Sequence, residues 1–119
     1  TEWKYLFDIN FEIIKKCIEW LDIKINLIKE SELNIEGQSS EKLLNICKKL
    51  NADTYVSGSG GKNYLDESLF SKNNIQIIFQ NYSSSIYPQN SSVFIPDLSI
   101  IDLLVNLGPN SKSFLFDHN

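Results

Sequence analysis

Residues 56–66 read VSGSGGKNYLD, a run of small residues followed by a lysine. The run lies between a β-rich segment and a helix-like segment. A glycine-rich turn in that position exposes backbone N–H groups near the positive end of the helix, where anions bind. Lys62 would add a positive charge. The same residues also fit a tight turn whose glycines permit positive φ angles, so the local pattern leaves both interpretations open.

Neither common phosphate-binding motif matches this run. A Walker loop needs four residues between its first glycine and Gly-Lys, followed by Ser or Thr. Here two residues separate Gly58 from Gly61, and Asn63 follows the lysine. A dinucleotide fingerprint would need a further glycine at position 63.

Other residues that could do chemistry are sparse. Cys17 and Cys47 lie on the apolar faces of expected helices and are predicted to be small, buried and unpaired. No run of ligands at short spacing indicates a metal site. Asp66 and Glu67 are adjacent in an expected helix, so they point about 100° apart and are expected to be solvated charges. His118 is next to the terminus and is expected to be disordered.

Composition indicates one globular α/β domain over residues 1–119. The net charge of −4 and a pI of about 4.9 argue against nucleic acid as a partner. We find no apolar run of membrane-spanning length and no signal peptide, so we expect no membrane association and a cytoplasmic protein.

Helical and strand periodicities alternate along the chain. They predict helices at 7–23, 41–50, 62–70 and 98–107, strands at 23–29, 53–57 and 75–81, and an irregular segment at 83–98. Ser39 or Ser40 is expected to cap the second helix, and Gly108-Pro109 to end the last. Strands separated by helices favour parallel pairing. We therefore predict a small three-layer α/β/α unit with a mainly parallel sheet of about three strands.

Three blocks, SELNIEGQSSEKLLNICKKLNADTYVSGSGGKNYLDESLF, IYPQ and FIPDLSIIDLLVNLGP, together resemble the WbqC-like protein family. The resemblance implies that residues 1–119 form the carboxyl-terminal half of a larger protein, because the family's amino-terminal His-Gln-Pro-type motif is absent. Thr1 as first residue agrees with an excised piece. Two departures are notable: Ser84-Ser85 stand where the family often has His-Pro, and Ser59 where it commonly has proline.

The resemblance implies acyl or aminoacyl transfer to amino sugars in bacterial surface-polysaccharide (O-antigen) biosynthesis. It favours ligand contact for the matching residues Ser57, Gly58, Gly60, Gly61, Lys62, Tyr64, Tyr87 and Gln89. Asp102 is expected to cap or pair near the last helix, and Tyr87 and Gln89 equally fit a rigid turn. Catalytic residues and a cofactor are not assigned.

Two functions remain open at this point. One is a transferase or ligase half-site that holds a nucleotide-activated sugar or another phosphorylated small molecule through Lys62 and the loop amides. The other is a non-catalytic ligand-binding or interaction module, which the missing motif and Ser84 favour. Because a small sheet leaves an edge unpaired, we also expect a homodimer or marginal stability.

Overall fold

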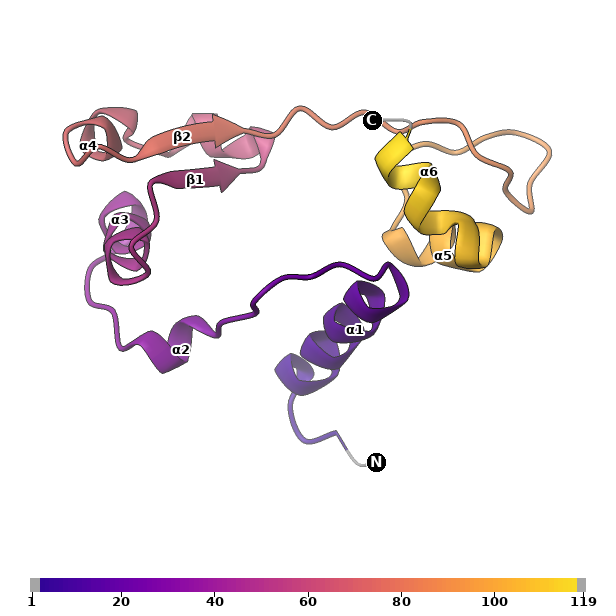
Figure 1. Cartoon of the computed structure of the whole chain (residues 1–119), viewed down its shortest axis with the longest axis horizontal. Coiled ribbons are helices and arrows are strands. Elements are labelled where there is room, and N and C mark those ends of the chain that lie inside the picture. Colours follow the sequence, from indigo (N-terminus) through magenta and orange to yellow (C-terminus); the bar gives the residue numbers. More distant parts are fainter. Residues whose placement is uncertain (1–2, 118–119) are drawn as a thin grey trace. The chain divides into compact units, whose positions relative to one another are not determined.

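The computed structural model describes residues 3–117 (Figure 1), so His118 lies outside the described residues. The elements in order are α1 (Leu6–Trp20), α2 (Glu30–Leu33), α3 (Ser39–Lys49), β1 (Thr54–Ser57), the 3-10 helix η1 (Ser59–Asn63), α4 (Glu67–Ser71), β2 (Gln76–Phe79), α5 (Ile100–Leu107), the 3-10 helix η2 (Gly108–Asn110) and α6 (Ser111–Asp117). The chain divides into two compact units. We call Leu27–Asn81 the sheet unit, and Thr1–Asn26 with Tyr82–Asn119 the helical unit.

Two parallel strands form the sheet of the sheet unit, and the chain between them passes through η1 and α4. Thr54 pairs with Gln76 and Ser57 with Phe79 in the register. This confirms the predicted parallel pairing of residues 53–57 with 75–81. A parallel pair requires such a crossover, because its strands run in the same direction.

One face of this sheet packs on a hydrophobic core. Phe70 of α4 is fully buried, and its ring stacks on Tyr55 of β1 with centroids 5.6 Å apart. The other buried members of the core are Leu44, Cys47, Leu65 and Ile75. Amphipathic helix α3 supplies Leu44 and Cys47, which explains the helical spacing of the apolar residues in that segment.

The opposite face of the sheet is open. Val56 and Ile78 are a register pair on that face, and they are 63% and 45% exposed. Parallel sheets are normally covered on both faces. Helices combined with a parallel pair of strands confirm the α/β class. The predicted three-layer arrangement is not confirmed, because one sheet face is open, and the expected homodimer stays a prediction.

The predicted strand at residues 23–29 is wrong, because this segment contains no strand. The sheet has two strands among residues 3–117 rather than about three. Alternation of apolar residues describes a face, but a strand forms only when its backbone pairs with a neighbour and that face is buried. Here Ile25 and Leu27 remain 60% and 39% exposed, so burial gives no support to pairing.

The predicted helix at residues 62–70 is in fact two short helices. Helix η1 ends at Asn63, and Asp66 caps α4, since its carboxylate accepts a hydrogen bond from the Leu69 amide at 3.2 Å. A short acidic side chain in that position satisfies an amide that has no partner within the helix. The cap carboxylate therefore separates η1 from α4.

The helical unit contains α1, α5, η2 and α6. Cys17, Leu21 and Leu103 are its buried apolar residues, and both cysteines of the chain are buried and unpaired, as predicted. Helix α5 ends at Gly108, whose φ of 52° suits glycine, so the predicted stop is confirmed. Helix α6 was not predicted. Its first residue, Ser111, is buried, and its hydroxyl donates to the Gly108 carbonyl oxygen at 2.8 Å.

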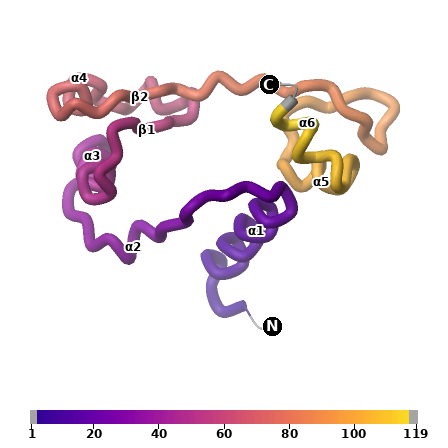
Figure 2. The backbone as a smooth tube through the Cα atoms, viewed as in Figure 1, coloured from indigo at the N-terminus to yellow at the C-terminus, as the bar shows by residue number. Residues whose placement is uncertain are grey.

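Between β2 and α5 the backbone runs through residues 80–99 without a helix or strand (Figure 2). This confirms the irregular segment predicted at 83–98. No helix among residues 3–117 is both long and apolar enough to cross a membrane.

An ion pair joins the end of the α1 segment to α6, with Lys112 Nζ 2.8 Å from Asp22 Oδ2. Hydrogen bonds from Lys112 and then Lys24 lower the pKa of Asp22 from 3.8 to about 2. A carboxyl whose folded pKa is depressed contributes stability that is complete above its unfolded pKa. The contribution of Asp22 is therefore complete above about pH 4 and is lost as the pH falls toward about 2.

We predict that Lys112→Met raises the pKa of Asp22 toward 3.8, as followed by NMR titration of the Asp22 side chain. Lys24→Met is the matched control: it also removes an ion pair from Asp22, but Lys24 is two residues away and joins no distant segments. It should raise this pKa by less than Lys112→Met does. An Asp22 that titrates near 3.8 in the parent chain would contradict the ion pair.

Candidate functional site

The glycine loop, residues 57–64, begins where β1 ends. Ser57 is buried, and its hydroxyl donates to the Gly58 carbonyl oxygen at 3.1 Å. The Gln80 amide donates to the Ser57 carbonyl oxygen at 2.7 Å and so ties the loop to the end of β2. The loop therefore lies at the carboxyl ends of two parallel strands, where ligands of open α/β sheets bind.

The three glycines of the loop have different roles. A Cβ at Gly61 would lie 2.1 Å from Ser57 Oγ and 3.1 Å from Leu65 Cδ1, so this position must lack a side chain for η1 to pack on β1. A Cβ at Gly58 or Gly60 would meet nothing within 4 Å. Neither packing within the described residues nor close contact accounts for these two glycines.

Positive φ does not account for them either. Gly58 has a φ of −62°, and the glycines with positive φ are Gly37 and Gly108. Positive φ therefore does not explain the glycines of the loop, and the alternative interpretation of the loop as a tight turn stays untested. What Gly58 and Gly60 have in common is a backbone that no side chain covers.

Unpaired backbone donors lie beside these glycines. The amide of Gly61 donates to the Gly58 carbonyl oxygen at 3.0 Å. Ser59 and Gly60 are the first two residues of η1, so their N–H groups have no acceptor within that helix. In the part of the chain that the structure describes, no other acceptor is found for them. Two N–H groups are thus free to bind an acceptor from outside.

Lys62 is exposed, and its ammonium lies 5.4 Å from the centre of the Phe79 ring. A cation at this distance from an aromatic face is attracted by the ring. Since Phe79 is the last residue of β2, the contact keeps the positive charge at the carboxyl end of the sheet. Tyr64 is 61% exposed at the far end of the loop.

Ser40 fixes the exit of the glycine loop, a role that sequence reasoning missed. Its buried hydroxyl accepts from the Asp66 amide at 3.0 Å and donates to the Tyr64 carbonyl oxygen at 3.4 Å. The expectation that Ser39 or Ser40 caps α3 is wrong, because Gln38 takes the cap position without a side-chain bond. The signal in the sequence that could have indicated this role is the position of Ser40, a polar residue in the first turn of the amphipathic helix α3.

Tyr87 and Gln89 lie in the helical unit and share one partner. The Tyr87 hydroxyl donates to Asp102 Oδ2 at 2.7 Å, and Gln89 Nε2 lies 3.3 Å from the same oxygen. The expected pairing of Asp102 near the last helix is confirmed. Burial, and then the bond to Asp102, raise the pKa of Tyr87.

Gln89 also holds the irregular segment together. Its side-chain amide donates to the Ile95 carbonyl oxygen at 2.9 Å and accepts from the Ile95 amide at 2.8 Å. With Asp102 as a third partner, both amide hydrogens of Gln89 are in use. This arrangement supports a rigid turn; ligand contact by Gln89 stays a prediction.

Ser84, the position where the family often has histidine, is bonded to Asp97. Its hydroxyl donates to Asp97 Oδ1 at 2.7 Å and accepts from the Asp97 amide at 2.9 Å. The partner of this hydroxyl is a carboxylate, which is a weaker base than the histidine that activates a serine nucleophile in a serine–histidine pair. Asp97 was missed from the sequence, since nothing in the local pattern indicates a partner 13 residues away.

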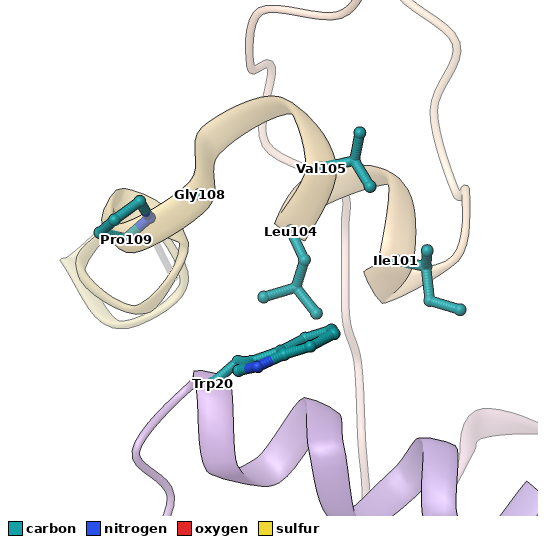
Figure 3. Close-up of a pocket in the computed structure, with 6 residues that line it drawn as sticks. All are labelled: Trp20, Ile101, Leu104, Val105, Gly108 and Pro109. Carbon is teal, nitrogen blue, oxygen red and sulfur yellow. The ribbon is translucent and has the colours of Figure 1, made fainter. Parts of the chain in front are cut away.

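The helical unit also contains an apolar cavity of about 510 Å³ between α1 and α5. Figure 3 shows Leu104 directed toward the indole of Trp20, with Ile101 and Val105 beside it on α5. Such a lining suits an apolar group and offers little to a phosphate or a sugar hydroxyl. Among residues 3–117, no three His, Cys, Asp or Glu side chains are grouped so that they could hold a metal ion.

The close approach at Gly61 gives a stability prediction. Gly61→Ala should lower the free energy of unfolding by about 1–3 kcal/mol, because the new methyl group displaces Ser57 Oγ or Leu65. Gly60→Ala, where the space is open, should change it by no more than about 0.5 kcal/mol. Chemical denaturation measures both.

Ser57→Ala combined with Gly61→Ala tests the cause of that loss. Removing Oγ relieves the shortest contact, so the double variant should be more stable than the sum of the single changes predicts. Equal effects of Gly60→Ala and Gly61→Ala would show that the loop does not pack in this way.

The model of the WbqC-like protein family matches residues 1–114 of this chain. The chain is also 29% identical over 108 residues to Uncharacterized protein Rv1507c of Mycobacterium tuberculosis, an alignment that covers 90% of this chain and 47% of that protein. The chain thus spans about half the length of this curated relative. No solved structure gives a significant match. Because the family model matches nearly the whole length of the chain, the chain belongs to the WbqC-like protein family.

Proposed function

We propose that this chain takes part in the transfer of an acyl or aminoacyl group to an amino sugar during bacterial surface-polysaccharide synthesis. In this proposal the glycine loop holds the anionic group of a nucleotide-activated sugar or another phosphorylated small molecule. Membership of the WbqC-like family supports the reaction class. The geometry of the loop supports its role in holding an anion.

One observation carries the proposal: Gly58 and Gly60 lack a side chain where the fold leaves room for one. Glycine costs conformational entropy on folding, so an alanine in such a position would be the more stable choice. A ligand that must approach the backbone closely gives a reason for glycine. The free amides of Ser59 and Gly60 are the groups that such an approach would reach.

The charges around the loop agree with an anionic ligand. Lys62 is exposed and is held near the carboxyl end of the sheet by Phe79. A phosphate oxygen that accepts from backbone amides and lies near an ammonium forms charge-assisted hydrogen bonds, which are about twice as strong as neutral ones. The loop supplies both kinds of donor from residues 59–62.

A non-catalytic ligand-binding module is the second candidate function. Ser84 replaces the family's histidine, and its hydroxyl is bonded to the Asp97 carboxylate, a weaker base than histidine. The chain also spans 47% of its curated relative, so groups that act in the reaction can come from the other half. Anion binding by this chain without turnover, together with turnover by a full-length relative, would favour this candidate.

Replacing Lys62 by Ala should weaken binding of ATP or a nucleotide sugar by about 1–3 kcal/mol, the usual range for a charge-assisted contact. Calorimetric titration of the parent chain and of Lys62→Ala measures this loss of binding free energy. Lys49→Ala is the matched control, since Lys49 is exposed on α3 and lies outside the loop. Equal affinity of the parent and Lys62→Ala for every phosphorylated ligand, or no binding by either, would contradict the proposal.

Gly60→Val provides a second variant that separates binding from folding. The space at this position accepts a side chain, so the thermal stability should change little. The branched side chain would, however, cover the free amides and reduce binding of the same ligands. Undiminished binding by Gly60→Val would mean that no ligand approaches this backbone.

A further inference from the structure

A second cavity of the helical unit, about 240 Å³, lies beside Tyr87. It is smaller than the roughly 300–1,000 Å³ of sites for drug-sized ligands, so it suits a single ring or a short chain. Its lining combines hydroxyl groups with aliphatic side chains and consists of Tyr82, Ser84, Tyr87, Leu98, Ser99, Ile100, Leu103 and Leu115. None of these residues is basic.

Two of the lining hydroxyls have already used their hydrogen. Ser84 donates to Asp97 Oδ1 at 2.7 Å, and Tyr87 donates to Asp102 Oδ2 at 2.7 Å. A hydroxyl has one hydrogen to donate and two lone pairs that accept. Each of these oxygens can therefore meet a ligand as an acceptor only.

The carboxylates of Asp97 and Asp102 keep the two hydroxyls as hydrogen-bond acceptors toward a ligand, and they add negative charge. Burial of the ring, and then the bond to Asp102, raise the pKa of Tyr87, so the phenol keeps its hydrogen. Gln89 donates to the same Asp102 oxygen at 3.3 Å, and Phe94 and Phe114 make T-shaped contacts with the Tyr87 ring, with centroids 5.4 and 5.7 Å away. The acceptors are thus held in place before a ligand arrives.

We propose that this cavity binds a small ligand through a primary amine. A protonated amine has three hydrogens to donate and no lone pair, and it gains from the charges of Asp97 and Asp102 behind the two hydroxyls. The aliphatic residues Leu98, Ile100 and Leu103 would contact the carbon skeleton of the ligand.

This inference deepens the proposed function, on which it rests for the identity of the amine: the acceptor amino sugar, bound as its ammonium ion. Before the amine can attack an acyl group it must lose one proton, which passes through the Ser84 or Tyr87 hydroxyl to the Asp97 or Asp102 carboxylate. The two can nevertheless be tested separately. The glycine loop belongs to the sheet unit and the cavity to the helical unit. Binding of phosphate is read at residues 58–62, and binding of the amine at residues 82–103.

The probe is D-glucosamine, compared with D-glucose, which has the same ring with a hydroxyl in place of the amine. Amide spectra of the ¹⁵N-labelled chain should shift at Ser84, Tyr87 and Ser99 as glucosamine is added. Glucose should bind at least tenfold more weakly, as expected for the loss of a hydrogen bond to a charged group. Equal affinity for the two sugars, or no shift with glucosamine, would overturn the proposal.

Asp97→Asn and Asp102→Asn test the role of the carboxylates. Each variant keeps an oxygen that accepts the hydroxyl hydrogen but removes the charge, so each should weaken glucosamine binding about tenfold. Asp53→Asn is the matched control, since Asp53 is exposed in the sheet unit. Unchanged glucosamine binding by both cavity variants would overturn the proposal.

Lys62→Ala distinguishes the two hypotheses. It should leave glucosamine binding unchanged while it weakens the binding of phosphorylated ligands. If the parent chain fails to bind phosphorylated ligands but still prefers glucosamine to glucose, the loop hypothesis is contradicted and the amine hypothesis is not. If it binds phosphorylated ligands but does not distinguish the two sugars, the amine hypothesis alone is contradicted.

Discussion

The close approach of Gly61 to Ser57 determines how the glycine loop folds. A side chain at position 61 would overlap Ser57 Oγ, so only glycine lets η1 turn back onto the end of β1. That contact directs Leu65 into the core that Phe70 fills, and it leaves the start of η1 at the carboxyl end of the sheet. The amides of Ser59 and Gly60 are free because they begin η1, and the packing at Gly61 holds η1 in that position.

Periodicity predicted where the longer helices lie: α1, α3 and α5 follow from their apolar spacing. The parallel pairing of β1 with β2 follows from the order of the elements, in which helices separate the strands. The strand at 23–29 was wrong because pairing requires a neighbour that alternation does not reveal. Helix α6 was missed because its first residue, Ser111, is bonded to the carbonyl oxygens of Leu103 and Gly108, contacts that apolar spacing does not reveal.

The candidate site was predictable where it is contiguous in sequence. Ser57 through Lys62 form one loop, and the structure brings them together as the pattern indicated. Ser40 and Asp97 were not predictable in their observed roles, since each bonds to residues 13 or more positions away. The identity of a residue limits what it can bond to, but the fold decides which partner comes within reach.

The account rests on the claim that the amides of Ser59 and Gly60 bind an anion. The most direct measurement is a titration of the ¹⁵N-labelled chain with UDP-N-acetylglucosamine, followed through the amide proton shifts. We predict that the amide protons of Ser59 and Gly60 move to higher frequency in proportion to occupancy, as expected for new hydrogen bonds to phosphate, while the amide of Gly61, already bonded to Gly58, moves less. Shifts confined to other parts of the chain, or no shift up to saturating ligand, would contradict the account.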